Sequence, residues 1–465
     1  MNDFFTLMRS ELVITIIIFL LLFIRIGKGI SNQKLLLLVQ VLLGINVVAG
    51  FTMNEDGNLF GGLFHTDALI STQKNILNIG VFLISLLFAD WLKSSNNLSE
   101  FFMLMLSALL GMFFLLSSGS LLMFYLSLEL ASIPVAAMAN FDLQKRLSSE
   151  AAVKMILSSA FSSGILLFGI SLVYGATGTI NFSELPALLQ LNNLQIIAFV
   201  FLFAAFAFKL SIVPFHLWTA DVYQGSPTAA TAFLSVISKG AFAFIFITSL
   251  YKIFQPLHTV WYNMVMFLSI VTMIIGNLFA LRQQNIKRFL AFSSIAQVGF
   301  ILVGISSNNQ EGVTAVVYFI MIYIFSNLAA FGVVDAVVTQ SGKELINDYK
   351  GFYQENKFLS WIIALALFSL AGVPPTAGFF GKLFLIKAGA SQGSYWYIAI
   401  VSLNLVISLY YYLKIVRAIF MEQNYHPVQP IQINYSAKIG FIICAAGILL
   451  TGFIAWVYDY IQSLS

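Results

Sequence analysis

Five ionisable side chains lie inside long apolar stretches of this sequence: Glu129, Lys154, Lys209, Lys239 and Lys382. If those stretches cross a membrane, each buried charge costs about 2.5–3.5 kcal/mol, and such residues are usually kept for a function. A lysine buried without a counter-ion can exist as the neutral amine, so it can both take up and release a proton. One glutamate among four lysines therefore predicts a proton relay, in which Glu129 pairs with Lys209.

The competing interpretation for each lysine is that its long side chain extends to the membrane surface. Glu129 and Lys239 lie in the middle of their apolar stretches, so a buried role is favoured for both. Lys209 and Lys382 each lie close to a proline, and a buried role is favoured for them too. Lys154 comes only a few residues into its stretch, so both interpretations stay open for it.

His216 is a further candidate for the relay, because imidazole titrates near neutral pH. A structural histidine with satisfied hydrogen bonds is an equally good interpretation. Lys387, Asp335 and Asp90 come near the ends of apolar stretches, and we expect them at the membrane interface.

The segment FAFKLSIVPFHLW, residues 206–218, combines Lys209 with Pro214. Proline removes a backbone hydrogen bond and interrupts a helix. In a membrane such a break persists only where protein or water satisfies the freed groups. We therefore expect the break at Pro214 to supply the polar surroundings in which Lys209 holds a transferable proton.

The composition identifies the elements that must position these residues. The chain has 465 residues, of which 60% are hydrophobic and 9% charged, and its mean hydropathy is +0.92. A soluble domain carries about 25% charged residues, so the sequence predicts an integral membrane protein. The apolar runs lack the alternation of barrel strands, which favours an all-α polytopic bundle.

Fourteen runs are long enough to span a bilayer, which takes about 20 residues each. They are centred near residues 19, 43, 83, 109, 129, 163, 203, 237, 270, 297, 325, 367, 407 and 446. The first run, Leu12 to Ile26, has no small-residue cleavage site, so we expect a retained helix rather than a signal peptide.

The basic residues predict the orientation, because cytoplasmic loops are rich in lysine and arginine. With both termini outside, four of the 23 basic residues lie within spans and four lie on the outer side, namely Arg9, Lys74, Lys252 and Lys387. The remaining fifteen lie inside: Arg25, Lys28, Lys34, Lys93, Lys145, Arg146, Arg282, Lys287, Arg288, Lys343, Lys350, Lys357, Lys414, Arg417 and Lys438. This asymmetry predicts both termini on the outer side of the membrane, and it accounts for the net charge of +4 without nucleic-acid binding. We expect that membrane to be a bacterial inner (plasma) membrane.

Two matches predict an internal repeat. LSIVP at 210–214 matches LAGVP at 370–374, an offset of 160, and residues 153–169 match residues 316–332 weakly at an offset of 163. Five helices per unit make the second unit inverted, with a discontinuous fourth helix in each. We therefore expect an N-terminal three-helix segment at 1–98, repeats at 99–255 and 256–425, and a last helix at 426–465.

Redox and metal chemistry are not expected in this chain. A single cysteine, Cys444, cannot hold an iron–sulfur cluster alone, and His65, His216, His258 and His426 lack metal-ligand spacing. No glycine-rich phosphate loop follows a strand.

Beyond these patterns, long motifs carry a resemblance. Glu129 together with residues 208–241, KRFLAFSSIAQVGF at 287–300 and AGVPPTAGFFGKLFLIKA at 371–388 resembles the antiporter-like membrane subunits of respiratory complex I. The phrase GVPPTAGFFGK is most similar to the N-type members. M-type members have glutamate where Lys382 stands, and L-type members continue into a lateral helix. Gln297 departs from the pattern, because related sequences commonly have histidine there.

The resemblance implies a role for each residue. Glu129 and Lys209 would form an ion pair modulated by Lys154, Lys239 would be the central relay residue, and Lys382 would exchange protons with the outer side. It also implies that the subunit binds no cofactor, since the complex uses NADH and quinone elsewhere. Its partners would be an M-type neighbour, the small membrane subunits and the lipid bilayer.

Two other interpretations remain at this point. A subunit of an Mrp-type cation/proton antiporter would share the same fold and relay. A passive structural spacer in a complex would carry the same charges without using them.

Overall fold

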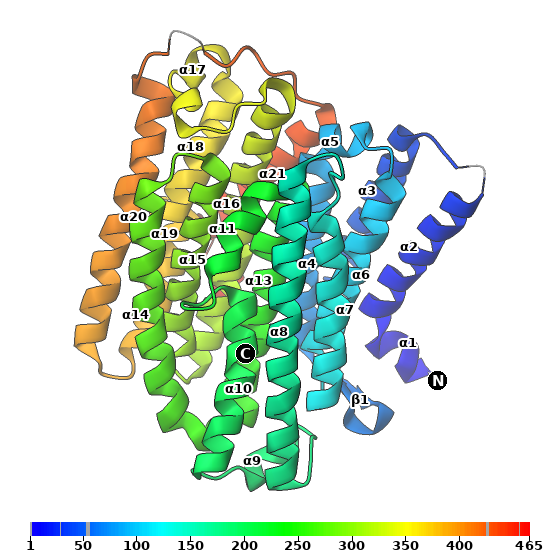
Figure 1. The fold of residues 1–465 in the computed structure, drawn as a ribbon, viewed down its shortest axis with the longest axis vertical. Helices are drawn as coiled ribbons and strands as arrows, with labels where there is room; N and C mark the ends of the chain where they lie inside the picture. Colours follow the sequence, from blue (N-terminus) through cyan, green and yellow to red (C-terminus); the bar gives the residue numbers. More distant parts are fainter. Residues whose placement is uncertain (1, 28, 53–55, 425–426, 455) are drawn as a thin grey trace.

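The chain folds into a bundle of long helices that run in the same general direction (Figure 1). The computed structural model describes residues 2–27, 29–52, 56–424, 427–454 and 456–465. Lys28 and His426, which enter the counts above, lie outside the described residues. Within the described residues, 12 helices are long and apolar enough to cross a membrane.

The N-terminal segment combines three long helices with a small hairpin. Its elements are α1 (Asn2–Leu7), α2 (Arg9–Ile26), α3 (Asn32–Ala49), β1 (Gly57–Leu59), η1 (Phe60–Gly62), β2 (Phe64–Thr66), α4 (Ala68–Leu87) and α5 (Ala89–Ser94). The two strands pair antiparallel. Figure 1 shows α2 leaning away from the bundle at one end.

Asp67 joins this hairpin to α4. Its carboxylate accepts a hydrogen bond from the Ile70 amide at 2.7 Å and so caps the helix N-terminus. Burial acts to raise the pKa of Asp67, but the hydrogen bonds from His65 and Ile70 and the charge of Lys252 outweigh it, so its pKa lies below the ordinary value. The ionised carboxylate therefore holds the start of α4 in place.

The first of the two larger groups of helices follows. It contains α6 (Leu98–Leu116), α7 (Leu121–Ala139), α8 (Arg146–Thr177), α9 (Leu185–Leu188), α10 (Asn193–Leu210), α11 (Leu217–Gly225), α12 (Thr228–Ala232), η2 (Phe233–Ser238), α13 (Lys239–Thr248) and η3 (Ser249–Ile253). The turns η2 and η3 are π-helical, so the segment from α12 to η3 is one continuous helix with two wider turns.

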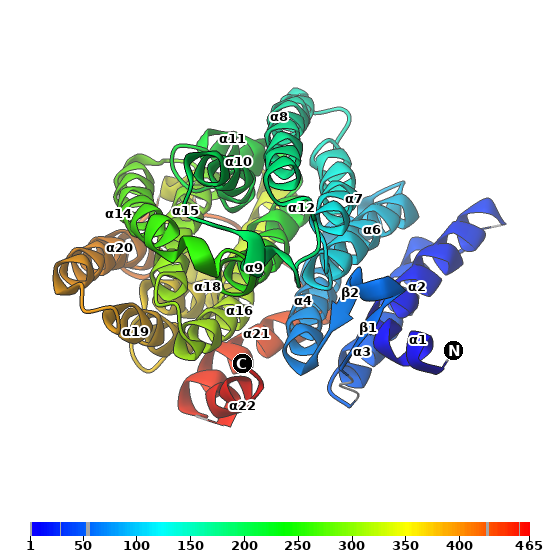
Figure 2. The ribbon, with the colours of Figure 1, turned by 90° about the horizontal axis from the view of Figure 1, so that it is seen from below.

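The second group contains η4 (Gln255–Leu257), α14 (His258–Arg282), α15 (Ile286–Ile305), α16 (Gln310–Ser341), η5 (Ile346–Tyr349), α17 (Phe352–Glu355), α18 (Lys357–Ala371), α19 (Ala377–Ala390) and α20 (Tyr395–Met421). The chain ends with α21 (Tyr435–Phe453) and α22 (Trp456–Leu464). Seen along the bundle in Figure 2, α6–α8 and α10 lie on one side, and α14, α15, α18 and α20 lie on another.

This fold confirms the predicted polytopic helical bundle. The expected fourteen spans are compatible with it. Two further spans are accounted for by α2, with 18 residues, and by the interrupted pair α18 and α19, with 15 and 14 residues. The helices α8 and α16 are the third of each group; both have 32 residues and both end at a left-handed glycine, Gly178 or Gly342. These features are compatible with the repeat.

Both predicted helix breaks are present and have the same hydrogen bonds. After α10, Ser211 is left-handed and the Ile212 amide bonds to the Ala207 carbonyl at 2.8 Å. After α18, Gly372 is left-handed and the Val373 amide bonds to the Phe368 carbonyl at 3.0 Å. The offset is therefore 161, so the predicted match of Pro214 with Pro374 is wrong by one residue. Pro375 is the counterpart, and the consecutive prolines concealed the shift.

Three helices form the centre of the molecule. The most apolar windows of the helix 228–253, of α15 and of α16 are 100%, 94% and 89% buried. The helix α12 packs against α16, and α15 packs against α16 and α19. A polar side chain on any of these helices must therefore find its partners inside the protein.

Candidate functional site

Lys209, in the last turn of α10, is buried with a 7% exposed surface. Its Nζ donates to the Ser132 hydroxyl of α7 at 2.5 Å and to the Ser159 hydroxyl of α8 at 2.7 Å. It also lies 5.9 Å from the ring centroid of Phe242, one turn beyond Lys239. Both hydrogen-bond partners are neutral, so this lysine sits between two helices without a contacting counter-ion.

Glu129 does not contact Lys209 directly. Within the described residues, no carboxylate lies within 4.0 Å of the Lys209 ammonium. Glu129 lies on α7 one turn before Ser132, and its Oε1 is buried without a hydrogen bond. The two residues therefore do not form the direct ion pair that was predicted, and Ser132, one turn from Glu129 on α7, binds Lys209 instead.

Lys239 begins α13, immediately after the π-helical turn η2, and is 2% exposed. Its Nζ donates to the Ser294 hydroxyl of α15 at 2.5 Å and lies 5.6 Å from the ring centroid of Tyr223. An aromatic face stabilises a cation that lacks a carboxylate. The central lysine is thus held by one hydroxyl and one ring.

Gln297 connects this lysine to the second helix break. It lies one turn beyond Ser294 on α15, and its Nε2 donates to the Leu370 carbonyl at 3.0 Å and to the Tyr412 hydroxyl at 3.1 Å. Its Oε1 is buried with no hydrogen-bond partner. A buried acceptor of this kind is where ordered water binds in proteins.

Lys382, on α19, reaches the same carbonyl. Its Nζ donates to Leu370 O at 2.7 Å and to Ala371 O at 3.3 Å, and it is 1% exposed. These are the last carbonyls of α18, where a helix end carries partial negative charge. The side chain passes Gly372, where an added Cβ would lie 3.2 Å from the Lys382 Cδ.

The two helix breaks differ in whether their carbonyls accept a hydrogen bond from a lysine. At the second break, the freed carbonyls bind Lys382 directly. At the first break, the Phe208 carbonyl accepts from the Trp218 indole at 3.1 Å, whereas Lys209 bonds to α7 and α8. The Pro214 break therefore does not supply the hydrogen bonds of Lys209, which go to Ser132 and Ser159.

Lys154 lies apart from this buried group. Its side chain is 41% exposed and its Nζ lies 2.7 Å from Glu150 and 2.6 Å from Asp221. Asp221 also pairs with Arg288 at 2.7 Å. The surface interpretation therefore describes this residue, whose charge belongs to a network that joins α8, α11 and α15.

His216 lies in the first break, just before α11. It is buried, and its Nδ1 has no hydrogen-bond partner. Among the described residues, no hydrogen bond joins it to any of the relay lysines. His216 is therefore not hydrogen-bonded to the relay lysines.

The structure contains a buried ion pair that was not predicted from the sequence. Lys74, expected at the outer surface, is instead 1% exposed within α4, and its Nζ lies 2.6 Å from Glu11 of α2. Its ammonium also lies 5.1 Å from the ring centroid of Phe64. The expectation was wrong because Glu11 brings a carboxylate to the lysine, which therefore has no need to reach water.

Asp335, which was expected at the membrane interface, lies six residues before the end of α16, and its side chain is covered by protein. It is 4% exposed, because the 32-residue helix α16 is covered by neighbouring helices close to its end. Lys387 does lie at the surface, where it pairs with Glu311 at 3.2 Å.

With this geometry, comparison with known proteins becomes informative. A family model described as "NADH:quinone oxidoreductase/Mrp antiporter, TM" matches residues 118–408. NADH-quinone oxidoreductase subunit N of Phocaeicola vulgatus is 43% identical over 460 residues, 98% of this chain and 97% of that protein. The subunit N of Azobacteroides pseudotrichonymphae is 46% identical over 420 residues, 89% of this chain and 87% of that protein.

The chain belongs to this family of membrane proteins. The predicted resemblance to N-type members is confirmed, since these relatives are named subunit N. A chain of respiratory complex I from Thermus thermophilus has the same fold, with a TM-score of 0.83, 25% identity and coverage of 98% of this chain and 100% of that one. A chain of the Mrp complex from Dietzia sp. DQ12-45-1b matches with a TM-score of 0.84 at 20% identity, covering 98% of each chain, which shows the shared fold alone.

Sequence reasoning missed the three serines that bind the lysines, and it singled out Gln297 without finding its contacts. Ser132, Ser159, Ser294 and Gln297 all lie on faces of apolar helices, and each is buried. A signal was present, because Ser132 follows Glu129 by one turn and Gln297 follows Ser294 by one turn. Residues at this spacing share a helix face.

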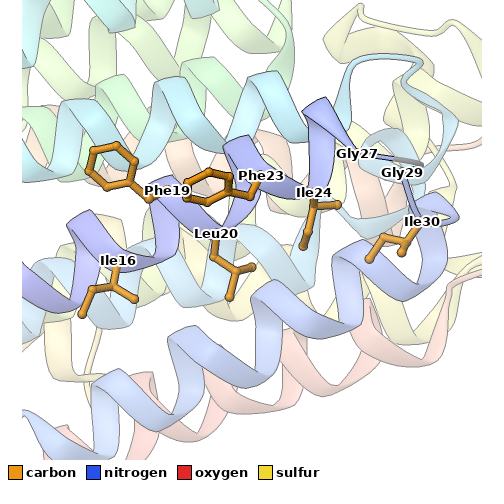
Figure 3. A pocket seen from close by; sticks show the side chains of 8 residues that line it. All are labelled: Ile16, Phe19, Leu20, Phe23, Ile24, Gly27, Gly29 and Ile30. Carbon is orange, nitrogen blue, oxygen red and sulfur yellow. The ribbon is translucent and has the colours of Figure 1, made fainter.

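Other features do not provide an alternative site. No group of three or more His, Cys, Asp and Glu residues that could hold a metal ion occurs in the part of the chain that the structure describes. A groove of about 690 Å³ runs along α2, lined by the apolar residues labelled in Figure 3. None of its described lining residues is ionisable, so it does not take part in the proton chemistry.

Proposed function

We propose that this chain is a proton-translocating membrane subunit of NADH-quinone oxidoreductase, and that Lys209, Lys239 and Lys382 carry the protons. The observation that supports this most strongly is the link through α15, where Ser294 binds Lys239 and Gln297 shares the Leu370 carbonyl with Lys382. Each lysine has neutral partners, so it can lose its proton without leaving a carboxylate unpaired. Buried lysines in such surroundings exchange protons near neutral pH.

In the proposed sequence, each step moves one proton. Lys239 takes a proton from the inner side and passes it to Lys382, which releases it to the outer side. Lys209, next to the charge of Glu129, gives up and regains a proton as these steps occur, and Lys154 adjusts the pair from the surface network. His216 has the chemistry to extend this path but no hydrogen bond to it, so we assign it a structural role.

The partners follow from the proposed complex. We assign the chain an M-type neighbour, the small membrane subunits and the lipid bilayer. Glu129 is partly exposed on α7, bordered by exposed Leu126, Leu130 and Ile133. A carboxylate facing lipid is costly, which supports placing a neighbouring subunit over this face.

The reaction with NADH and quinone is placed in other subunits, so this chain acts as a non-redox part of the enzyme. We place it in a bacterial plasma membrane with both termini outside. The division into a segment 1–98, repeats 99–255 and 256–425 and a last helix 426–465 belongs to the same proposal.

A subunit of an Mrp-type antiporter is the second candidate, since its fold is shared. The relatives at 43% and 46% identity favour the quinone-linked complex. Genes next to this one would separate the two, because an Mrp operon lacks the quinone module.

Lys209→Ala tests the proposal, with Lys252→Ala as the matched control, since the Lys252 side chain is 64% exposed at the surface. In inverted membrane vesicles, Lys209→Ala is expected to lower NADH-driven proton accumulation at least about tenfold, while the control stays within twofold of the parent chain. Equal accumulation in both variants, with equal amounts of assembled complex, would contradict the proposal.

A further inference from the structure

A buried carboxylate outside the relay lies at the end of the bundle where α12 begins and α16 ends. Asp335 is 4% exposed and lines a cavity of about 540 Å³ together with Thr228 and Lys287. The other charged residues that line this cavity are Asp142, Lys145, Arg146 and Glu344. The Lys145 side chain is 67% exposed, so the cavity opens to solvent. Asp335 is thus a buried acid that water can reach.

The other acids of this cavity are already engaged. Asp142 lies 2.8 Å from the Lys145 ammonium. Glu344 lies 3.5 Å from Lys287 and accepts from the Asn285 amide at 2.9 Å. Both are therefore fixed as partners at the rim.

Asp335 has different surroundings. Among the described residues, no cation lies within 4.0 Å of it, and the neutral Thr228 side chain lines the same cavity. The charged groups that act on it are the ammonium of Lys287 and the carboxylates of Asp90 and Asp142. Its carboxylate is therefore the one in the cavity that can gain and lose a proton without breaking an ion pair.

A stripe of polar residues leads from this cavity to the central lysine. Thr228, Thr231, Ser235 and Lys239 follow one another at intervals of three or four residues along one continuous helix, and all are buried. This spacing places them on one helix face. Ser235 lies within the π-helical turn η2, and Lys239 is the first residue after this turn. From Thr228 to Lys239 the helix rises about 16 Å.

The facing helix α16 supplies polar groups along the same path. Asn327, two turns before Asp335, donates to the Ser235 hydroxyl at 3.3 Å. Three buried hydroxyls nearby have no hydrogen-bond partner: Ser226 in the cavity lining, Tyr223 beside Lys239, and Tyr323 one turn before Asn327. Unpartnered buried polar atoms mark sites where ordered water completes a hydrogen-bond network. Water at these hydroxyls would close the gaps between the polar side chains.

We infer that Asp335 is the proton-loading carboxylate of this subunit, which takes protons from the water of this cavity and passes them along the α12–α16 contact to Lys239. In the first step, hydronium gives one proton to the carboxylate and leaves as water. In the second step, the neutral Lys239 amine takes that proton through Ser235, Asn327 and bound water, and the carboxylate is restored. The inference rests on the proposed function, because it names the donor for the central lysine.

The test compares Asp335→Asn and Asp335→Glu in the assembled complex within inverted membrane vesicles. The control is Glu422→Gln, which changes a carboxylate that pairs with Lys350 and does not line the cavity. Proton accumulation driven by NADH is measured at several pH values, from neutral to alkaline, of the solution outside the vesicles. This solution is the one that contacts the cavity. Asp335→Asn is expected to lower proton accumulation at least about tenfold. The loss should grow as the pH rises, because proton uptake then becomes limiting. Asp335→Glu and Glu422→Gln stay close to the parent chain.

Two results would overturn the inference. In one, Asp335→Asn pumps like the parent chain at every pH. In the other, Asp335→Asn and Asp335→Glu lose the same activity at every pH, which describes a structural partner of Lys287. Lys239→Ala, run in parallel, separates the two proposals: if it loses pumping while Asp335→Asn does not, only the loading role fails. If Lys239→Ala pumps normally, the proposed function fails.

Discussion

At the scale of single residues, the lysines are distinguished by what they contact. Lys209, Lys239 and Lys382 bond to hydroxyls or carbonyls, whereas Lys74 and Lys154 bond to carboxylates. A neutral acceptor binds the ammonium and still allows it to lose its proton and become a neutral amine. A buried carboxylate instead stabilises the charged form of the lysine. The hydrogen-bond partner therefore separates transfer sites from structural ones.

Glu129 provides a test at this scale. Glu129→Gln removes the negative charge one turn from Ser132 and keeps the shape of the side chain. We expect a severalfold fall in NADH-driven proton accumulation, because the charge that acts on Lys209 is lost. Lys387→Ala, which removes an exposed residue paired with Glu311, is the control and should have little effect. Equal effects of the two changes would refute the assignment of Glu129.

The sequence predicted the buried lysines well and their partners poorly. Glu129, Lys209, Lys239 and Lys382 were recognised because an ionisable residue within an apolar run has few explanations. The burial of Lys74 and Asp335 was not predicted, because position along one helix does not reveal which other helices cover it. Glu11 and Lys74 are far apart in the sequence and meet only when α2 packs near α4.

At the scale of helices, the break after α18 has the clearest chemical purpose. A helix that stops inside the protein leaves its last carbonyls without amide partners, and Lys382 and Gln297 use them. Both breaks were predictable from proline. The register was not, since either Pro374 or Pro375 fits the pattern and only the backbone hydrogen bonds decide.

The attachment of α2 to the bundle gives a prediction about stability. Glu11→Gln leaves Lys74 buried without a counter-ion, which costs about 3–5 kcal/mol, so the thermal unfolding midpoint of the purified complex should fall clearly. Arg25, also on α2, pairs with Glu100 of α6, and this pair is partly exposed. Glu100→Gln should cost at most about 1 kcal/mol. Similar midpoints for the two variants would show that the Glu11 pair does not anchor α2.

At the scale of the whole molecule, the polar groups form one line through an apolar bundle. It runs from the cavity at Asp335 past Ser235 and Lys239 to Ser294, Gln297 and Lys382. Three of the helices that carry it, namely residues 228–253, α15 and α16, have the most buried windows of the 12 candidate spans in the described residues. The fold class followed from composition and periodicity, but this line depends on contacts among four helices that no single stretch of sequence specifies.

The central claim is that protons cross this subunit by way of Lys239. The most direct measurement is the number of protons accumulated per NADH oxidised in vesicles that contain the Lys239→Ala variant. The account predicts an assembled complex in which proton accumulation and the coupled oxidation of NADH fall together by at least about tenfold. Assembly, electron transfer and proton accumulation that all persist at the parent level would contradict it.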